Sequence, residues 1–320
     1  MNFTRRALLA LTAASFVAST AFAQAWPAKP IRVIVPFPAG GGTDVLTREV
    51  TGKMPGYNFV VENRPGAGGN LGVDAAAKST ADGYTLVMGQ TSNLAINPTL
   101  YSHLPYDPVK DLTPIGLVAS SPLLIVTSAN SPFHTIEDVI KEAKAHPGSI
   151  NFASSGNGTV AHLTMVELQK QAGIKLTHIP YKGASQGTTD VMSGAVQLYV
   201  SSVPTLIGHI RSGKMRALAV TSAKRVADLP QVRTVAESGY KGFESVTWFG
   251  ILGPANLSKD IVSKLNADIN KALKDAELKK QFDAQGADIL GGTPEQFARL
   301  IRDDVARWGA VVKESGAKID

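Results

Sequence analysis

The 320-residue chain contains no cysteine, and only 7% of its residues are aromatic. The absence of cysteine excludes disulfide bonds and thiolate metal sites. Charged residues are scattered, and no like-charged block longer than Lys279-Lys280 stands out. Nucleic-acid-binding proteins usually show clustered basic residues interleaved with aromatic ones, so the sequence predicts that nucleic acid is not a partner.

Several nucleotide and metal motifs are also missing. A phosphate-binding P-loop requires Gly-Lys-Ser/Thr, and no lysine lies between Lys29 and Lys53. A dinucleotide fingerprint counted from Gly40 requires glycine where Val45 stands, and the second glycine cluster at 66–69 fails in the same way. The six histidines are dispersed, without the H-E-x-x-H spacing of zinc enzymes. We therefore expect no cofactor and no metal.

An export signal begins the chain. Arg5-Arg6 precede an apolar run over 7–17, which is too short to remain as a membrane-spanning helix, and Ala21-Phe22-Ala23 form an A-x-A cleavage site. We expect residues 1–23 to be a signal peptide, leaving a soluble chain of 320 − 23 = 297 residues. Residues 4–9 also look like a twin-arginine signal, so the export route stays open between the general and twin-arginine pathways.

The mature chain has a mild basic excess and room for two domains. Removal of Arg5 and Arg6 leaves 30 basic and 26 acidic residues, a net charge of +4. Such an excess suits the capture of small anions. A length of 297 residues is enough for two compact domains with separate cores.

The stretch 31–44 predicts a strand, a glycine turn and a helix start. Ile31 to Val35 are mostly β-branched, as in a buried parallel strand, and Gly40-Gly41-Gly42 form a turn without side chains. Thr43-Asp44 then open an apolar-periodic segment in the manner of a helix N-cap. This geometry points backbone N–H groups at an anion, although a ligand-free connection is an equally good interpretation of three glycines alone.

Strand and helix signals alternate almost to the end of the chain, which predicts an α/β protein with parallel sheets. Strands are expected at 31–35, 58–63, 84–89, 123–127, 150–153, 178–181, 196–200, 216–221 and 247–252. Helices are expected at 70–78, 135–145, 160–172, after 185, at 259–274 and at 294–314. The helix at 135–145 should be capped by Thr135 with Asp138 three residues later. The segment 98–114 is expected to be irregular, and 90–93 to be a polar tip.

The order of these elements predicts two domains with a cleft between them. The first would comprise 24–122 plus 239–320, and the second, inserted domain 123–238. Small or polar residues follow several strands, at 38–44, 66–70, 90–93, 154–159 and 183–185. In open α/β sheets such strand ends face the ligand crevice, so we expect an anion to bind between the domains.

One catalytic motif occurs between the predicted elements that it requires. Gly183-Ala184-Ser185-Gln186-Gly187 matches the G-x-S-x-G nucleophile elbow, with a strand before it and a helix after it. A triad would then need an acid and a histidine downstream. Asp190 falls inside the helix that follows, and His209 is the only later histidine. The residue order therefore argues against an enzyme, and a secreted serine hydrolase using Ser185 is retained as the alternative.

Several further stretches form a recognisable set of motifs: Trp26–Arg32, Pro38–Asp44, Val61–Gly69, Ser154–Thr159 with His162-Leu163, Tyr181–Gly183, Arg216–Ser222 and Trp248–Gly250. In combination and order they resemble the Bug family, the periplasmic substrate-binding receptors of tripartite tricarboxylate transporters. The resemblance implies a two-domain type II periplasmic-binding-protein fold, a periplasmic monomer, and no enzymatic activity. It further implies capture of a small di- or tricarboxylate or aromatic carboxylate and delivery to an inner-membrane permease.

The resemblance also implies the ligand-binding residues. In the first domain they are Phe37, Ala39, Gly40, Gly42, Thr43, Asp44, Gln90, Ser92 and Asn93. In the second domain they are Ser154, Ser155, Gly158, Thr159, His162, Gly183 and Ala184.

The chain departs from the family pattern near the end of the strand expected at 196–200. Relatives often carry aspartate where Gln197 and Ser201 stand, and asparagine at Ser202. Loss of acids near the cleft favours plain carboxylates over amino acids, whose ammonium group needs a carboxylate partner. Ser201 is expected either to bind ligand or to cap the helix that opens at Pro204.

Overall fold

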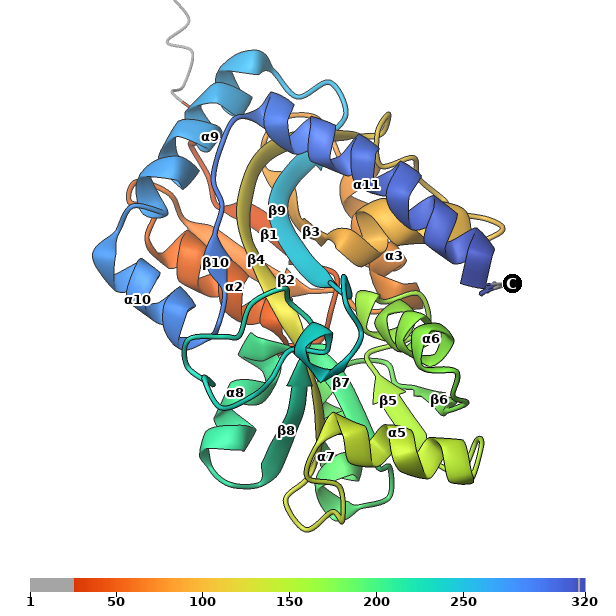
Figure 1. The fold of residues 1–320 in the computed structure, drawn as a ribbon. Helices are drawn as coiled ribbons and strands as arrows, with labels where there is room; N and C mark the ends of the chain where they lie inside the picture. The colour runs from red at the N-terminus through yellow and green to blue at the C-terminus, as the bar shows by residue number, and fades with distance from the viewer. Residues whose placement is uncertain (1–25, 316, 320) are drawn as a thin grey trace, which may run out of the picture.

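One strand, β4 (Leu112–Ser128), runs through both halves of the molecule (Figure 1). The structure is a computed structural model that describes residues 26–315 and 317–319, so the expected signal peptide lies outside the described residues. The strand order is β2 (Phe59–Asn63), β1 (Ile31–Val35), β3 (Thr85–Gln90), β9 (Val246–Pro254), β4, β7 (Leu198–Ser202), β5 (Asn151–Ser154) and β6 (Thr177–Pro180). Two further strands, β8 (Met215–Val220) and β10 (Asp288–Ile289), also pair with β4.

The pairing of β4 divides the molecule into two lobes. Its residues up to Pro122 pair with β9, and from Leu123 onward they pair with β7 and β8. We call the part built on β2, β1, β3, β9 and β10 the first lobe, and the part built on β7, β5, β6 and β8 the second lobe. The chain returns to the first lobe just before β9.

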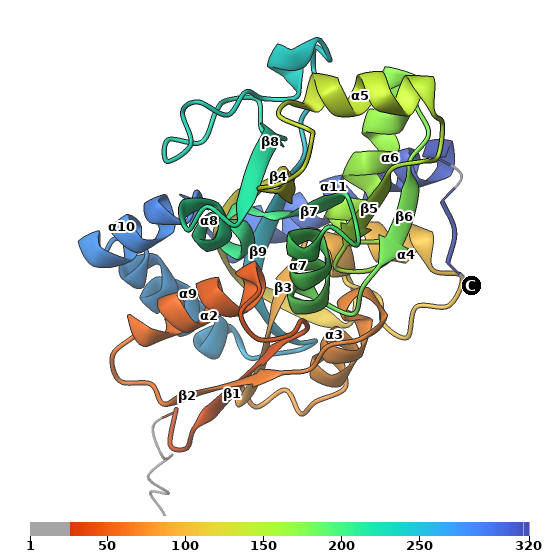
Figure 2. The same cartoon turned by 90° about the horizontal axis from the view of Figure 1, so that it is seen from below.

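Helices cover both faces of the sheet in each lobe. In the first lobe, α2 (Gly42–Gly52), α9 (Lys259–Ala272) and α10 (Ala276–Ala284) cover one face, and α3 (Asn70–Ala77) and α11 (Pro294–Ser315) the other. In the second lobe, α7 (Ala184–Ser193) and α8 (Val203–Arg211) lie opposite α5 (Ile136–Ala145) and α6 (Val160–Ala172). Figure 2 shows α2 of the first lobe beside α8 of the second. None of the described helices is long and apolar enough to cross a bilayer.

Several elements form as local sequence signals predict. The strand over 31–35 and the helix over 160–172 have the expected ends. The capping box of α5 is also confirmed, because Thr135 Oγ1 accepts from the Asp138 N–H (3.2 Å) and the Asp138 carboxylate accepts from the Thr135 N–H (2.9 Å).

The largest difference between the predicted and the observed elements concerns β4. This strand was expected only at 123–127 and begins eleven residues earlier, at Leu112. Pro114 and Gly116 disguise its first part, since both residues are unfavourable in strands. The register with β9 shifts between these two residues, and this bulge accommodates the proline. The sheets are also not purely parallel: β4 and β9 run antiparallel to their neighbours.

Two helical segments were missed. The expected polar tip after β3 is a buried π-helical turn, η3 (Ser92–Ile96), that leads into α4 (Asn97–Leu100). The helix α10 was also not expected, although Asp275 caps it by accepting from the N–H groups of Glu277 and Leu278.

Candidate functional site

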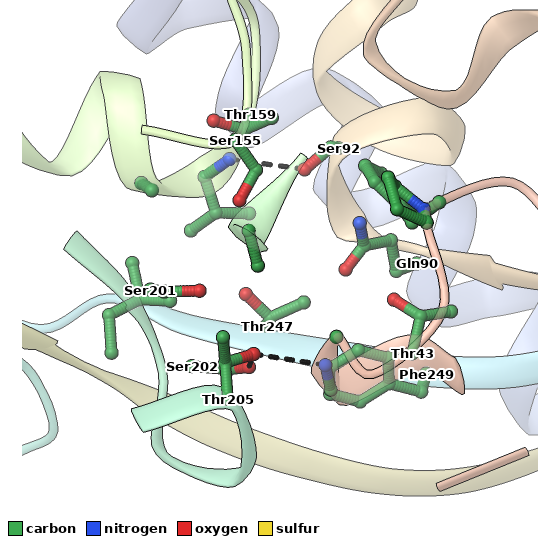
Figure 3. A pocket seen from close by; sticks show the side chains of 18 residues that line it. Thr43, Gln90, Ser92, Ser155, Thr159, Ser201, Ser202, Thr205, Thr247 and Phe249 are labelled. Atoms are coloured by element: carbon green, nitrogen blue, oxygen red, sulfur yellow. Dashed lines mark hydrogen bonds between the residues drawn. The ribbon is translucent and has the colours of Figure 1, made fainter. Parts of the chain in front are cut away.

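A narrow cavity of about 60 Å³ lies between the lobes (Figure 3). The first lobe contributes Phe37, Pro38, Gly41, Gly42, Thr43, Gln90, Ser92, Thr247 and Phe249 to its walls. The second lobe contributes Leu123, Ser155, Thr159, Val160, Ala161, Ala184, Ser201, Ser202 and Thr205. Eight of these side chains carry a hydroxyl group, and none of the described residues that line the cavity is charged. The walls therefore offer hydrogen-bond donors without an opposing carboxylate.

The N-terminal turns of four helices meet at this cavity. Gly42 and Thr43 begin α2, Val160 begins α6, Ala184 begins α7, and Ser202 is the N-cap of α8. Each helix N-terminus carries about half a positive charge from the aligned peptide dipoles and has first-turn N–H groups without a partner inside the helix. Four such ends around an acid-free cavity favour an anion.

The turn between β1 and α2 is held by a buried carboxylate. Asp44 accepts hydrogen bonds from the Gly40 N–H (2.9 Å), from Arg48 Nε (3.0 Å) and from Asn63 Nδ2 (2.9 Å). Burial alone would raise the pKa of Asp44, but the hydrogen bonds from Arg48, Gly40 and Asn63 outweigh it and lower the pKa below 3.8. Asp44 is therefore ionised at neutral pH and points into its own turn instead of into the cavity.

A matching turn in the second lobe is supported by two stacked histidines. His178 Nε2 is 2.7 Å from Ser154 Oγ, and the Gly158 N–H donates to His162 Nδ1 (3.3 Å). The two rings are parallel within 9°, with centroids 4.0 Å apart. Burial lowers the pKa of His162 to about 4, and burial together with the neighbouring His162 lowers the pKa of His178 to about 3. Both rings are thus neutral at pH 7 and act as supports for the turn.

This pair predicts a loss of stability in acid. The folded-state pKa values lie below the ordinary value of 6.5, so the stabilisation is complete above about pH 6.5 and is lost as the pH falls towards 4 and then 3. Urea unfolding at pH 7.5 and pH 5.0 should show a lower midpoint at pH 5.0. The double variant His162→Gln with His178→Gln should lose part of this pH dependence, whereas the exposed His103→Gln should keep all of it. If the double variant kept the full pH dependence of the urea midpoint, the loss of stability in acid would not come from His162 and His178.

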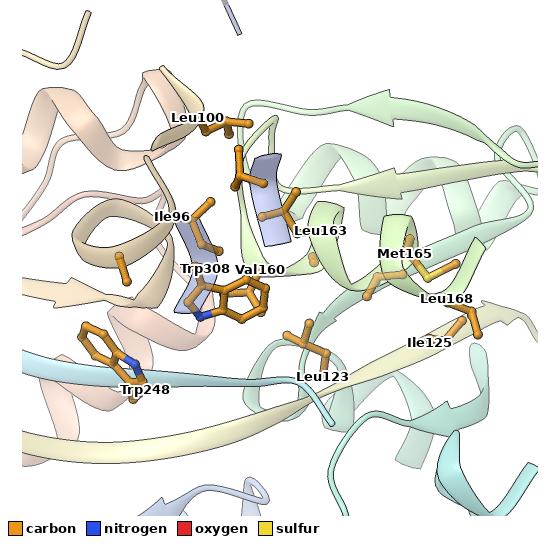
Figure 4. Packing of buried hydrophobic residues seen from close by; sticks show 14 of the residues in the cluster. Ile96, Leu100, Leu123, Ile125, Val160, Leu163, Met165, Leu168, Trp248 and Trp308 are labelled. Carbon is orange, nitrogen blue, oxygen red and sulfur yellow. The ribbon is translucent and has the colours of Figure 1, made fainter. Parts of the chain in front are cut away.

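The lobes touch each other directly around the cavity. The Gly42 N–H donates to Thr205 Oγ1 (2.9 Å), and the Val160 N–H donates to Ser92 Oγ (3.1 Å). A Cβ on Gly183 would stand 2.2 Å from Cγ of Pro38 in the opposite lobe. Apolar side chains from both lobes also form one cluster that includes Trp308 (Figure 4). The lobes are therefore closed on each other, and a side chain at Gly183 would clash with the Pro38 ring.

Comparison with known proteins agrees with this geometry. The family described as "Tripartite tricarboxylate transporter family receptor" matches residues 46–317. The chain is 39% identical to Protein BugT of Bordetella pertussis, with 100% of both chains covered. The chain belongs to this receptor family, the Bug family of periplasmic solute-binding proteins.

Solved structures of similar receptors have the same two-domain fold. An R. palustris protein with adipate is 32% identical, with a TM-score of 0.89 over 92% of this chain and 100% of that one. MatC from Rhodopseudomonas palustris, with bound malate, is 28% identical, with a TM-score of 0.85 over 90% of this chain and 100% of that one. Periplasmic binding protein BugD is 33% identical, with a TM-score of 0.87 over 92% of this chain and 99% of that one.

In this Bug receptor the cavity brings together nine of the seventeen residues predicted to bind ligand. They are Phe37, Gly42, Thr43, Gln90, Ser92, Ser155, Thr159, Ala184 and Ser201. The other eight do not line it: Ala39, Gly40, Asp44, Asn93, Ser154, Gly158, His162 and Gly183. Several of these eight shape the turns instead, as Asn93 does by accepting from the Gln90 N–H (3.0 Å).

Two expected caps were wrong. The N-cap of α2 is Gly41, not Thr43, and the N-cap of α8 is Ser202, not Ser201. Neither cap accepts a hydrogen bond from a backbone N–H of its own helix, since Gly41 has no side chain and the Ser202 hydroxyl is paired with the Thr205 hydroxyl (3.1 Å). The alternative capping role of Ser201 is thereby removed, and its side chain lines the cavity.

Sequence reasoning missed half of the cavity walls. Thr205, Thr247, Phe249 and Leu123 line it but lie outside the small-residue turns that follow the strands. Thr247 and Phe249 belong to the strand predicted at 247–252. Their inward direction follows from the alternation of side chains along β9, but the face that meets the second lobe is set by tertiary packing.

The serine hydrolase alternative finds no support in this receptor. Ser185 is exposed near the start of α7 and does not line the cavity. The Asp190 carboxylate accepts from the Tyr181 hydroxyl (2.6 Å), and His209 lies in the last turn of α8. Within the described part of the chain, no histidine is hydrogen-bonded to Ser185 that could act as its base.

Proposed function

We propose that this receptor binds a small carboxylate in the cavity between its lobes and releases it unchanged. The observation that carries the proposal is the convergence of four helix N-termini on a cavity without acidic residues. A carboxylate there would gain charge-assisted hydrogen bonds, each worth about 1.5–3 kcal/mol. Two similar receptors were solved with adipate and malate, which supports this ligand class.

The ligand is a plain carboxylate in this proposal, either a di- or tricarboxylate or an aromatic carboxylate. An amino acid would bring an ammonium group into a cavity where none of the described lining residues is acidic. Leaving that charge unpaired would cost several kcal/mol. Position 197, where relatives often carry aspartate, is the uncharged Gln197. Its Oε1 already accepts from the Asn151 N–H (3.0 Å) within the second lobe, so it does not offer a partner to an ammonium group.

The two lobes act as the two domains of a closing clamp. We infer a first domain of residues 24–122 plus 239–320 and a second domain of residues 123–238, which hinge at β4 and at the segment before β9. The direct contacts of Gly42 with Thr205 and of Ser92 with Val160 would form as the clamp closes on ligand. We also infer a monomer, which the resemblance to the family implies.

Export and delivery complete the proposal. We infer that residues 1–23 are removed and that the periplasmic protein hands its ligand to an inner-membrane permease of the tripartite tricarboxylate type, as the family description supports. Intact-mass measurement of periplasmic protein should give a chain beginning at Gln24. A periplasmic pool that retains Met1 would contradict the cleavage.

The proposed function is tested by a ligand screen. Purified mature protein should be stabilised by one or more carboxylates and not by the corresponding methyl esters or by simple amines. A ligand at 100 times its Kd adds about 2.7 kcal/mol to the free energy of unfolding. The same samples should show no ester turnover, and Ser185→Ala should bind the best ligand as wild type does. Ester hydrolysis that disappears in Ser185→Ala would overturn the proposal.

A further inference from the structure

One asparagine of the second lobe has the neighbour that makes a side-chain amide chemically labile. Asn157-Gly158 is the one Asn-Gly pair in the 320-residue sequence, and glycine, which has no side chain, lets its backbone nitrogen approach the preceding carboxamide. Asn157 is exposed, and within the described part of the chain nothing is hydrogen-bonded to its carboxamide. Asparagine is among the thermolabile residues that hyperthermophilic proteins avoid. The pair is therefore a candidate site of deamidation.

The backbone nitrogen that would attack the carboxamide is hydrogen-bonded to a base. The Gly158 N–H donates to His162 Nδ1 (3.3 Å), so this ring nitrogen carries no proton and is able to accept one. The His162 ring is held in place by stacking on His178, with the ring centroids 4.0 Å apart. An imidazole within reach of the proton that it removes has the arrangement of a general base.

The ionisable groups that face this base are uncharged near neutral pH. Burial lowers the pKa of His162 to about 4, and burial together with the neighbouring His162 lowers the pKa of His178 to about 3. Tyr101 faces Gly158 from the first lobe, and burial raises its pKa above 10.0. His162 is therefore able to accept a proton throughout the range between pH 6 and pH 8.

We propose that Asn157 is a modification site that deamidates with His162 as the base. His162 Nδ1 takes the proton of the Gly158 N–H as that nitrogen bonds to Cγ of Asn157, and the imidazolium returns the proton to the leaving amide nitrogen. Ammonia departs and a cyclic succinimide remains. Water then adds to one of the two ring carbonyls and breaks the bond of that carbon to the Gly158 nitrogen. Cleavage at Cγ gives aspartate, and cleavage at the backbone carbonyl gives isoaspartate.

The product carries a new negative charge beside the ligand cavity. Asn157 lies between Ser155 and Thr159, which both line the cavity, and it precedes the N-terminus of α6 (Figure 3). The added carboxylate would offset the positive end of this helix and repel an anion in the cavity. Deamidation would thus weaken carboxylate binding as the protein ages, a consequence that rests on the proposed function.

Closure of the lobes should slow the reaction. A Cβ on Gly158 would stand 2.3 Å from Cδ2 of Leu100 and 2.8 Å from Oδ1 of Asn97, so the turn is pressed against the first lobe. Ring formation moves the Gly158 nitrogen towards Cγ of Asn157, and the closed arrangement leaves little room for this shift. We expect the ligand-free receptor to deamidate faster than the liganded one, and equal rates would show that closure does not control the reaction.

Peptide mapping by mass spectrometry, after incubation at pH 6 and at pH 8, tests the proposal without any ligand. Wild type should convert Asn157 to its acidic products faster than the exposed Asn130, which precedes Ser131 and is the internal control. The rate at Asn157 should be nearly the same at both pH values, because the base is neutral at both. Conversion no faster than that of Asn130, or a rate that rises in proportion to hydroxide concentration, would overturn the proposal.

A change of the base gives an independent readout. His162→Gln should slow the conversion of Asn157 at pH 6 by at least about tenfold, since a positioned general base contributes that much or more. The remaining reaction should rise in proportion to hydroxide concentration. His103→Gln changes an exposed histidine of the first lobe and should keep the wild-type rate and pH profile. A rate in His162→Gln that equals or exceeds that of wild type would overturn the role of His162.

Calorimetry with adipate and malate tests the consequence for binding. Asn157→Asp, which copies the aspartate product, should bind the tighter of the two probes about threefold more weakly than wild type does. Asn157→Gln keeps an amide on a longer side chain, so it should bind as wild type does and resist modification. Equal binding by Asn157→Asp and wild type would overturn the link to affinity. Failure of both probes to bind wild type would count against the proposed function, and the mapping experiment would still decide the modification.

Discussion

Gly42→Asp should lose more than about 100-fold in affinity for the best carboxylate, which corresponds to about 3 kcal/mol. A Cβ at this position would stand 2.4 Å from Ser202 Oγ of the opposite lobe. The added carboxylate would also carry negative charge into the space where the four helix N-termini favour an anion. Steric exclusion and charge repulsion act in the same direction, so the effect should exceed that of any single hydroxyl deletion, such as Thr43→Ala at about 1–2 kcal/mol.

Two controls separate the causes of this loss. Gly52→Asp adds the same side chain to the other end of the same helix, where a Cβ would have no atom within 4 Å, and it should bind as wild type does. Gly42→Ala introduces the steric clash without the charge and should fall between wild type and Gly42→Asp. Calorimetry gives the affinities and circular dichroism confirms folding. A folded Gly42→Asp with wild-type affinity would show that the ligand is not held at this turn.

Gly183→Ala should prevent the lobes from closing. The new Cβ would lie 2.2 Å and 2.8 Å from ring atoms Cγ and Cδ of Pro38, and a proline ring cannot rotate away as a flexible side chain can. We expect the closed arrangement to be inaccessible and ligand affinity to fall by at least about tenfold, since closure supplies half of the cavity walls.

Closure itself can be followed by small-angle scattering. With saturating ligand, the radius of gyration of wild type should decrease, whereas that of Gly183→Ala should stay at its ligand-free value. Gly208→Ala is the matched control, because a Cβ there meets nothing within 4 Å and the residue lies on the neighbouring helix α8. If Gly183→Ala contracts on ligand addition as wild type does, the close approach to Pro38 is not needed for closure.

Local signals in the sequence predicted the parts of the fold that depend on neighbours along the chain. The strand at 31–35, the glycine turn after it and the capping box at Thr135 are examples, because their residues contact one another within a few positions. The β4 strand was mostly missed because Pro114 and Gly116 are tolerated only through a bulge against β9, a partner more than 130 residues away.

The candidate site was predicted in outline, and its inner details depend on tertiary contacts. The small-residue turns that follow strands indicated where helix N-termini would face the cleft, and Thr43 and Ala184 of these turns line the cavity. The inward turn of Asp44 depends on Arg48 and Asn63, and the support of the second turn depends on His162 stacking on His178 from a different element. The i,i+4 spacing connects Asp44 with Arg48, but no spacing rule connects Asp44 with Asn63, or His162 with His178, before the fold brings them together.

A crystal structure of the protein with its best carboxylate tests the central claim most directly. The account predicts that one carboxylate group of the ligand lies in the cavity between the lobes, within hydrogen-bond distance of the N-terminal turn of α2 and of hydroxyl groups from the second lobe. Ligand bound elsewhere, for example in the surface pocket between α6 and α11 beside Trp308, would contradict it.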